Sequence, residues 1–156
     1  MNNIIGIGEY FVSNKEGDTI TTYALASCVA VTLYCPLKKA SGMIHIALPE
    51  PMNNNQNAQK LGYYATTGLP LLFNKMENSF GCKKNELYIQ LYGGANSIRS
   101  DDVFCVGQKN IEAIKLILFS YGLRYNSQEV GGYVSRTIEM EVSTGCIKSV
   151  TQAIQI

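Results

Sequence analysis

The chain contains no tryptophan, one histidine (His45) and four prolines among its 156 residues. No apolar run approaches the roughly 20 residues that a membrane-spanning helix needs, so we expect no transmembrane segment. Charge is also scarce, because charged residues make up 16% of the chain and the formal net charge is +1. The sequence therefore lacks the basic stripe that binds a phosphate backbone, and nucleic acid is not an expected partner.

The five cysteines do not have the spacings of common metal or redox motifs. None forms a CxxC pair, which argues against a zinc knuckle and a thioredoxin-type site. A chain of this size buries roughly 70% of its unfolded surface, so it needs no disulfide framework. The start of the chain also lacks the basic and then apolar pattern of a signal peptide. We therefore predict a soluble cytoplasmic protein with reduced thiols.

Short β-type runs lie at both ends of the chain, and helical patterns lie between them. The two helices are expected over 63–80, where Pro70 should kink or restart the helix, and over about 110–121, before Gly122. The polar segment 49–60 is expected to be a surface loop. Strands are expected over 4–12, 19–23, 28–34, 43–48, 87–92, 124–130, 135–142 and 146–150. This order predicts an α+β layered fold in a single domain that spans residues 1–156.

Cys28 and His45 stand on consecutive predicted strands and could form a thiol–imidazole pair. The imidazole would take the thiol proton and later return it to a leaving group. Thr22 could be a third member whose hydroxyl orients the imidazole. The alternatives are ordinary: a buried cysteine is often a small apolar residue, a buried histidine often only makes a structural hydrogen bond, and threonine favours strands.

Paired glycines are the other prominent feature. Gly93-Gly94 and Gly131-Gly132 follow predicted strands, where they could bring the backbone close to a ligand or simply form turns. Arg136 follows the second pair on a predicted strand. It could contact an anion or a carbonyl group, or it could be an exposed or salt-bridged arginine.

Several segments together resemble the chemoreceptor glutamine deamidase family (CheD), in the family's order and over almost the whole chain. The segments are Gly6-Ile7-Gly8-Glu9-Tyr10, Thr22 followed by Ser27-Cys28-Val29-Ala30-Val31, Gly42-Met43-Ile44-His45-Ile46-Ala47-Leu48-Pro49, Gly93-Gly94-Ala95, Val106-Gly107-Gln108-Lys109-Asn110, and Gly131-Gly132 with Arg136.

The resemblance implies an enzyme that hydrolyses glutamine side chains of methyl-accepting chemotaxis receptors to glutamate through a cysteine thioester. It implies Cys28 as the nucleophile, His45 as general base and acid, and Thr22 as the residue that orients His45. It also implies a layered α/β sandwich of mixed sheets similar to the toxin-type deamidases, no metal or organic cofactor, and a CheC-type phosphatase as a partner. The alternative is a weakly catalytic or non-catalytic module that binds the phosphatase and chemoreceptors.

The segment before Cys28 departs from the family pattern. Gly-Leu-Gly-Ser-Cys is usual in the family, whereas this chain has Ala24-Leu25-Ala26-Ser27-Cys28. If either family glycine adopts a positive φ, the alanine at that position is strained.

Overall fold

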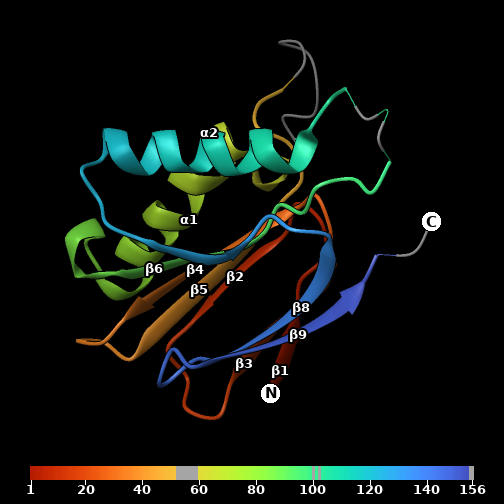
Figure 1. Ribbon diagram of the computed structural model, residues 1–156. Coiled ribbons are helices and arrows are strands. Elements are labelled where there is room, and N and C mark those ends of the chain that lie inside the picture. Colours follow the sequence, from red (N-terminus) through yellow and green to blue (C-terminus); the bar gives the residue numbers. More distant parts are fainter. Residues whose placement is uncertain (52–59, 100, 102, 155–156) are drawn as a thin grey trace.

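Three layers make up the computed structural model, which describes residues 1–51, 60–99, 101 and 103–154. Two helices cover one face of a five-stranded sheet, and a four-stranded sheet covers the other face (Figure 1). Each sheet contains one parallel pair among antiparallel ones, so both are mixed. The predicted α+β sandwich of mixed sheets with two main helices is confirmed.

The five-stranded sheet has the order β2-β5-β4-β6-β7. Its strands are β2 (Tyr10–Ser13), β5 (Ala40–Ile46), β4 (Val29–Cys35), β6 (Tyr88–Gly93) and β7 (Asn126–Val130). All seven residues of β5 are buried, because layers cover the sheet on both faces. β4 and β5 form the predicted hairpin, with Ala30 opposite His45.

The four-stranded sheet has the order β1-β3-β8-β9. Its strands are β1 (Asn2–Ile4), β3 (Thr19–Leu25), β8 (Val134–Glu141) and β9 (Ile147–Ala153). The inward residues of β8, Arg136, Ile138 and Met140, alternate with more exposed ones. That alternation is typical of a sheet with one buried and one solvated face.

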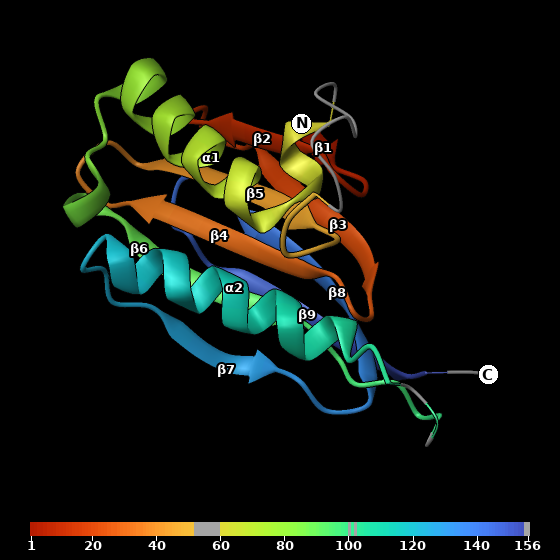
Figure 2. The ribbon, with the colours of Figure 1, turned by 90° about the horizontal axis from the view of Figure 1, so that it is seen from above.

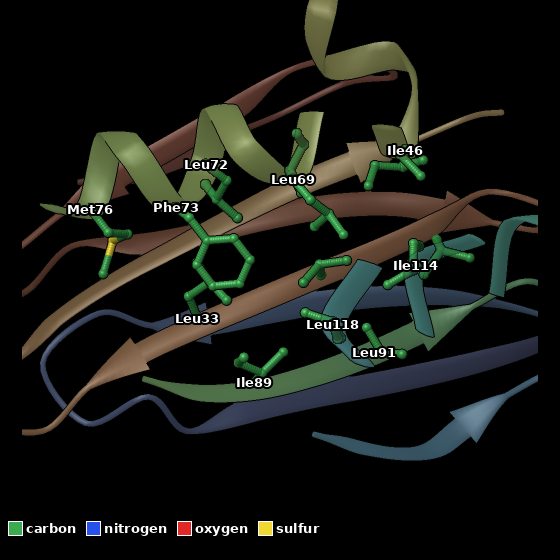
Figure 3. Packing of buried hydrophobic residues seen from close by; sticks show 14 of the residues in the cluster. Leu33, Ile46, Leu69, Leu72, Phe73, Met76, Ile89, Leu91, Ile114 and Leu118 are labelled. Atoms are coloured by element: carbon green, nitrogen blue, oxygen red, sulfur yellow. The ribbon is translucent and has the colours of Figure 1, made fainter. Parts of the chain in front are cut away.

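The helices α1 (Ala65–Phe80) and α2 (Val106–Ser120) lie side by side over the five-stranded sheet (Figure 2). The short 3-10 helices η1 (Leu61–Tyr63) and η2 (Lys84–Glu86) flank α1. The core between helices and sheet contains Phe73 and Met76 of α1, and Ile114 and Leu118 of α2 (Figure 3). A second core fills the space between the two sheets.

Three sequence predictions need correction. The single strand expected over 4–12 is two strands in different sheets, because the chain turns back at Gly6–Glu9, where Gly8 has a φ of 81°. The alternative that Pro70 starts a new helix is wrong, because α1 continues through it as one helix. α2 begins at Val106, earlier than expected. Most of the loop predicted over 49–60 lies outside the described residues.

No helix in the described parts of the chain is long and apolar enough to span a membrane.

Ala24 lies at an irregularity in β3, where the register with β8 shifts between Thr22 and Leu25. Its φ is 55°, in the left-handed region, and its N–H donates to the hydroxyl of Thr137 instead of a strand carbonyl. A side chain in this region costs about 1 kcal/mol or more, which glycine avoids. Ala26 does not have a positive φ. Only the first of the two alanines before Cys28 is therefore strained.

We predict that Ala24→Gly raises the free energy of unfolding by up to about 1 kcal/mol, since relief of strain outweighs the added freedom of the unfolded chain. Ala26→Gly is the matched control and should leave stability unchanged or lower it. Chemical denaturation of both variants measures the difference. Equal effects of the two substitutions would contradict the assignment of strain to Ala24.

Candidate active site

Cys28 stands at the end of the short loop between β3 and β4, and hydrogen bonds fix that loop from outside. The carbonyl oxygens of Ala26 and Cys28 accept from the N–H groups of Ala95 and Gly94, at 2.7 and 2.8 Å. The carbonyl oxygen of Ser27 accepts from the side chain of Asn110 on α2, at 2.9 Å. Because these three consecutive carbonyl groups all accept hydrogen bonds, the backbone that carries the half-buried Cys28 is fixed in place.

His45 lies on β5 and faces the four-stranded sheet. Its strand partner Ala30 belongs to the core between the sheets, and Cys28, two residues before Ala30, packs against the same core. The structure therefore places the two predicted residues on one face of the sheet. Cys28 lies one residue before β4, and no hydrogen bond between its Sγ and Nε2 of His45 is found among the described residues.

Thr22 comes from the opposite sheet, on β3, and is completely buried. Its Oγ1 lies 2.7 Å from Nδ1 of His45 and 2.8 Å from the carbonyl oxygen of Ile5. The hydroxyl has one hydrogen, which it donates to the Ile5 carbonyl, so its oxygen accepts from Nδ1–H. The predicted contact between Thr22 and His45 is present and links the two sheets.

This contact decides which ring nitrogen of His45 can act as a base. With the proton on Nδ1, the Nε2 atom carries a lone pair. Nε2 is buried, and no hydrogen-bond partner for it is found in the described parts of the chain. In the other tautomer, the buried Nε2–H would have no acceptor, and Nδ1 and the Ile5 carbonyl oxygen would compete for the single hydroxyl hydrogen of Thr22. Nε2 is thus available to accept a proton on the face that carries Cys28.

Burial keeps both groups neutral near pH 7. It lowers the pKa of His45 from 6.5 to about 4, and it raises the pKa of the Cys28 thiol. A thiolate–imidazolium ion pair is therefore not the resting state.

A cavity of about 620 Å³ opens beside Ser27. It is lined by the loop before Cys28, the segment after Gly94, the N-terminal end of α2 and parts of the chain near Tyr133 and Ile154. These walls come from five separate parts of the sequence. The cavity leaves room for a bulky ligand next to residues 26–28 (the nucleophile loop, named for the predicted role of Cys28).

Both glycine pairs lie close to this loop. Gly93 and Gly94 both have positive φ, and a side chain on Gly93 would overlap the carbonyl oxygen of Cys28. The N–H of Gly131 donates to the carbonyl oxygen of Gly93 at 2.8 Å. The close backbone approach that we considered for Gly93 is therefore present. Gly93 approaches the carbonyl group of Cys28, however, and not a ligand.

Arg136 is neither exposed nor in a salt bridge with any described residue. It is 7% exposed and donates from Nη2 to the carbonyl oxygen of Gly131 at 3.1 Å. Its Nε and Nη1 have no hydrogen-bond partner among the described residues. Burial lowers the pKa of Arg136 and the negative charge of Glu129 raises it. The alternative of an ordinary surface arginine was wrong.

Asn110 was predicted only as a residue near the start of a helix. It is completely buried on α2, and its Nδ2 donates to the carbonyl oxygens of both Ser27 and Ala47. A signal was present in the sequence: Asn110 shares the spacing of the core residues Ile114 and Leu118. A polar side chain on the apolar face of a helix requires buried partners.

Cofactor ligands are not grouped in the described parts of the chain. No cluster of three or more histidine, cysteine, aspartate or glutamate side chains is found there.

Fold and site together define a class of protein: an α+β sandwich with a cysteine, a histidine and a threonine gathered between its two sheets. A family model described as "CheD chemotactic sensory transduction" matches residues 47–151. The chain belongs to the CheD family.

Relatives match nearly the full chain. The "Probable chemoreceptor glutamine deamidase CheD" of Syntrophotalea carbinolica is 44% identical, and the alignment covers 92% of this chain and 90% of the relative. The "Chemoreceptor glutamine deamidase CheD" of Thermotoga maritima is 34% identical, with 93% and 88% covered. That of Halalkalibacterium halodurans is 37% identical, with 92% and 91% covered.

Two solved structures share the fold. The hypothetical protein YfiH of Bacillus licheniformis superposes with a TM-score of 0.51, and YlmD of Geobacillus stearothermophilus with 0.52. Both are 10% identical to this chain over 79% of its length. The chain spans about half the length of each (51% and 50%), and at this identity the likeness describes the fold alone.

The buried state of His45 predicts a pH-dependent stability. Above pH 6.5 the imidazole is neutral in both the folded and unfolded states, so it adds no pH dependence. Between pH 6.5 and about 4 the unfolded chain binds a proton that the folded chain does not, so stability falls as the pH falls. A shift of this size corresponds to about 3 kcal/mol.

The measurement is chemical denaturation of the wild type and of His45→Gln from pH 7 to pH 4. The carboxylates titrate in both proteins, so the difference between the two isolates His45. The wild type should lose about 3 kcal/mol more than the variant over this range. Parallel curves would mean that the pKa of His45 is not lowered by folding.

Proposed function

We propose that this protein hydrolyses the side-chain amide of specific glutamines on methyl-accepting chemotaxis receptors, giving glutamate and ammonia. The observation that carries the proposal is the buried Thr22–His45 hydrogen bond, which leaves Nε2 unpartnered on the face that carries Cys28. The relatives' names supply the substrate class. The proposal treats residues 1–156 as one working domain in the cytoplasm, where cysteine thiols stay reduced.

The first step is attack on the carboxamide. The Sγ atom of Cys28 forms a bond to the carboxamide carbon while Nε2 of His45 takes the thiol proton. The π electrons of the carbonyl move to oxygen and give a tetrahedral oxyanion. Thr22 supports the step because its oxygen holds Nδ1–H, so the positive imidazolium that forms keeps one fixed partner.

The backbone of the nucleophile loop offers donors for the oxyanion. The carbonyl groups of Ala26, Ser27 and Cys28 are all bonded, whereas the N–H groups of Ser27 and Cys28 make no hydrogen bond to another described residue. Fixed N–H donors near a developing oxyanion contribute about 3 kcal/mol each when well placed. We assign the oxyanion site to these two N–H groups.

The remaining steps return the enzyme to its starting state. The imidazolium of His45 gives its proton to the departing nitrogen, ammonia leaves, and a thioester joins Cys28 to the substrate. Nε2 then takes a proton from water, whose oxygen attacks the thioester carbon. The thiolate of Cys28 leaves and regains the proton, and the product is glutamate. No metal or organic cofactor enters these steps.

The receptor glutamines and the phosphatase partner both require an accessible surface. The cavity beside Ser27 has exposed apolar side chains in its lining, including Ile98 and Tyr133, which are 38% and 60% exposed. Exposed apolar groups of this kind mark binding surfaces. We propose that receptor helices and a CheC-type phosphatase bind here, which also favours the second candidate function: a module that binds these partners with little turnover.

The deciding prediction concerns Cys28. Cys28→Ala should reduce conversion of receptor glutamine to glutamate by at least about 1,000-fold, because no other group on this face can form the thioester. Mass spectrometry of a receptor fragment measures the mass gain from amide to acid. Cys146→Ala, which removes an exposed thiol at the β8–β9 hairpin, is the control and should retain wild-type activity.

Two outcomes separate the candidate functions. Activity that survives Cys28→Ala would contradict the nucleophile assignment. A wild type that binds receptor or phosphatase tightly without turnover, and binds equally well as Cys28→Ala, would establish the binding module instead.

A further inference from the structure

We infer that Asn110 is a positioning residue, which fixes the nucleophile loop relative to the strand of the base by bonding to both with one amide group. The inference rests on the proposed function, in which Cys28 and His45 act as a pair.

The two acceptors of Asn110 belong to the two segments that must be aligned. Ser27 immediately precedes Cys28, and Ala47 follows His45 by two residues on the same strand path. The two hydrogens of Nδ2 point to their carbonyl oxygens, at 2.9 and 3.0 Å. No other residue is seen to donate to the Ser27 carbonyl in the described structure. The side chain of Asn110 therefore links the segment before Cys28 to the segment after His45.

The amide acts here only as a donor. The Oδ1 atom of Asn110 is buried, and no hydrogen-bond partner for it is found among the described residues. The reverse orientation of the amide would place an oxygen against two carbonyl oxygens and is excluded by repulsion. A buried amide with an unpaired oxygen lowers the stability of the fold. The two hydrogen bonds that Asn110 donates explain why this amide stands on an otherwise apolar helix face.

The helix that carries Asn110 is itself firmly placed against the site. A side chain on Gly107 would overlap the carbonyl oxygens of Gly94 and Ala95, so α2 approaches this segment backbone to backbone. Gly94 and Ala95 in turn donate to the carbonyl oxygens of Cys28 and Ala26. α2 thus provides a rigid base from which Asn110 can hold both segments.

The β4–β5 ladder aligns Val29 with Ile46, but the carbonyl group of Ser27 lies before this ladder and is bonded by Asn110. The N–H groups of Ala47 and Leu48 donate to the carbonyl oxygen of Tyr63, which anchors the end of β5 to the segment before α1 but not to Cys28. Thr22 bonds to the ring of His45 from the other sheet, and neither of its two hydrogen bonds goes to the nucleophile loop. Asn110 is the side chain that donates hydrogen bonds to both the Ser27 and the Ala47 carbonyl groups.

The test uses Asn110→Asp, which has the same shape but presents an oxygen to both carbonyl groups. On a receptor fragment, kcat per folded molecule should fall by about 100-fold with KM nearly unchanged, because small displacements of the reacting groups cost rate steeply. Asn110→Ser, which can donate one bond, is the second variant and should fall less. Leu118→Ala on the same helix is the control: it lowers stability but should keep the wild-type kcat per folded molecule.

A second readout does not depend on turnover. Alkylation of Cys28 by iodoacetamide, followed by peptide mass mapping, reports the effect of His45 on the thiol. We expect the rate in Asn110→Asp to fall to that of His45→Gln, and the double variant to be no slower than either single one. If Asn110→Asp does not fold, Asn110→Ser is judged by the same criteria.

The inference is overturned if the variants fold and react like the wild type, or if their effects add fully to that of His45→Gln. A wild type that does not deamidate receptors, but whose Cys28 alkylation depends on both His45 and Asn110, would contradict the proposed function and support the positioning role.

Discussion

The hydrogen bond between the Thr22 hydroxyl and Nδ1 of His45 is the interaction on which the account of the site depends. It joins a strand of the four-stranded sheet to a strand of the five-stranded sheet, so it forms only when the two sheets are correctly packed. Because the same hydroxyl donates to the Ile5 carbonyl, the proton of the imidazole is confined to Nδ1. The fold thus fixes both the position and the tautomer of the base.

Burial gives this site a particular chemical character. The thiol of Cys28 and the imidazole of His45 are both neutral near pH 7, since removal from water disfavours each charged form. In the proposed mechanism, proton transfer then accompanies attack on the substrate instead of preceding it. The same burial is unfavourable for stability in mild acid, where the unfolded chain binds a proton that the folded chain excludes. Burial therefore lowers the free energy of unfolding in mild acid, and it also keeps the imidazole of His45 deprotonated over a wide pH range.

Local patterns in the sequence predicted the β4–β5 hairpin, both helices and the alternating strand β8, because these features depend on contiguous residues. The separation of 4–12 into two strands was missed, since the sheet that each half joins is decided by distant partners. Thr22 was considered as a third member of the site and was also implied by the family resemblance, but only sheet packing shows its contact with His45. The roles of Asn110 and of the left-handed Ala24 depend on segments far apart in the chain, which propensity and periodicity do not describe.

The most direct test of this account is the proton position on the single imidazole, measured by nitrogen NMR of the protein labelled with ¹⁵N-histidine at neutral pH. The account predicts one neutral ring with its proton on Nδ1 and a bare Nε2. In Thr22→Val, which removes the acceptor, the Nδ1–H form should no longer be preferred. A wild-type ring that carries its proton on Nε2, or that is charged at neutral pH, would contradict the assignment of His45 as the base.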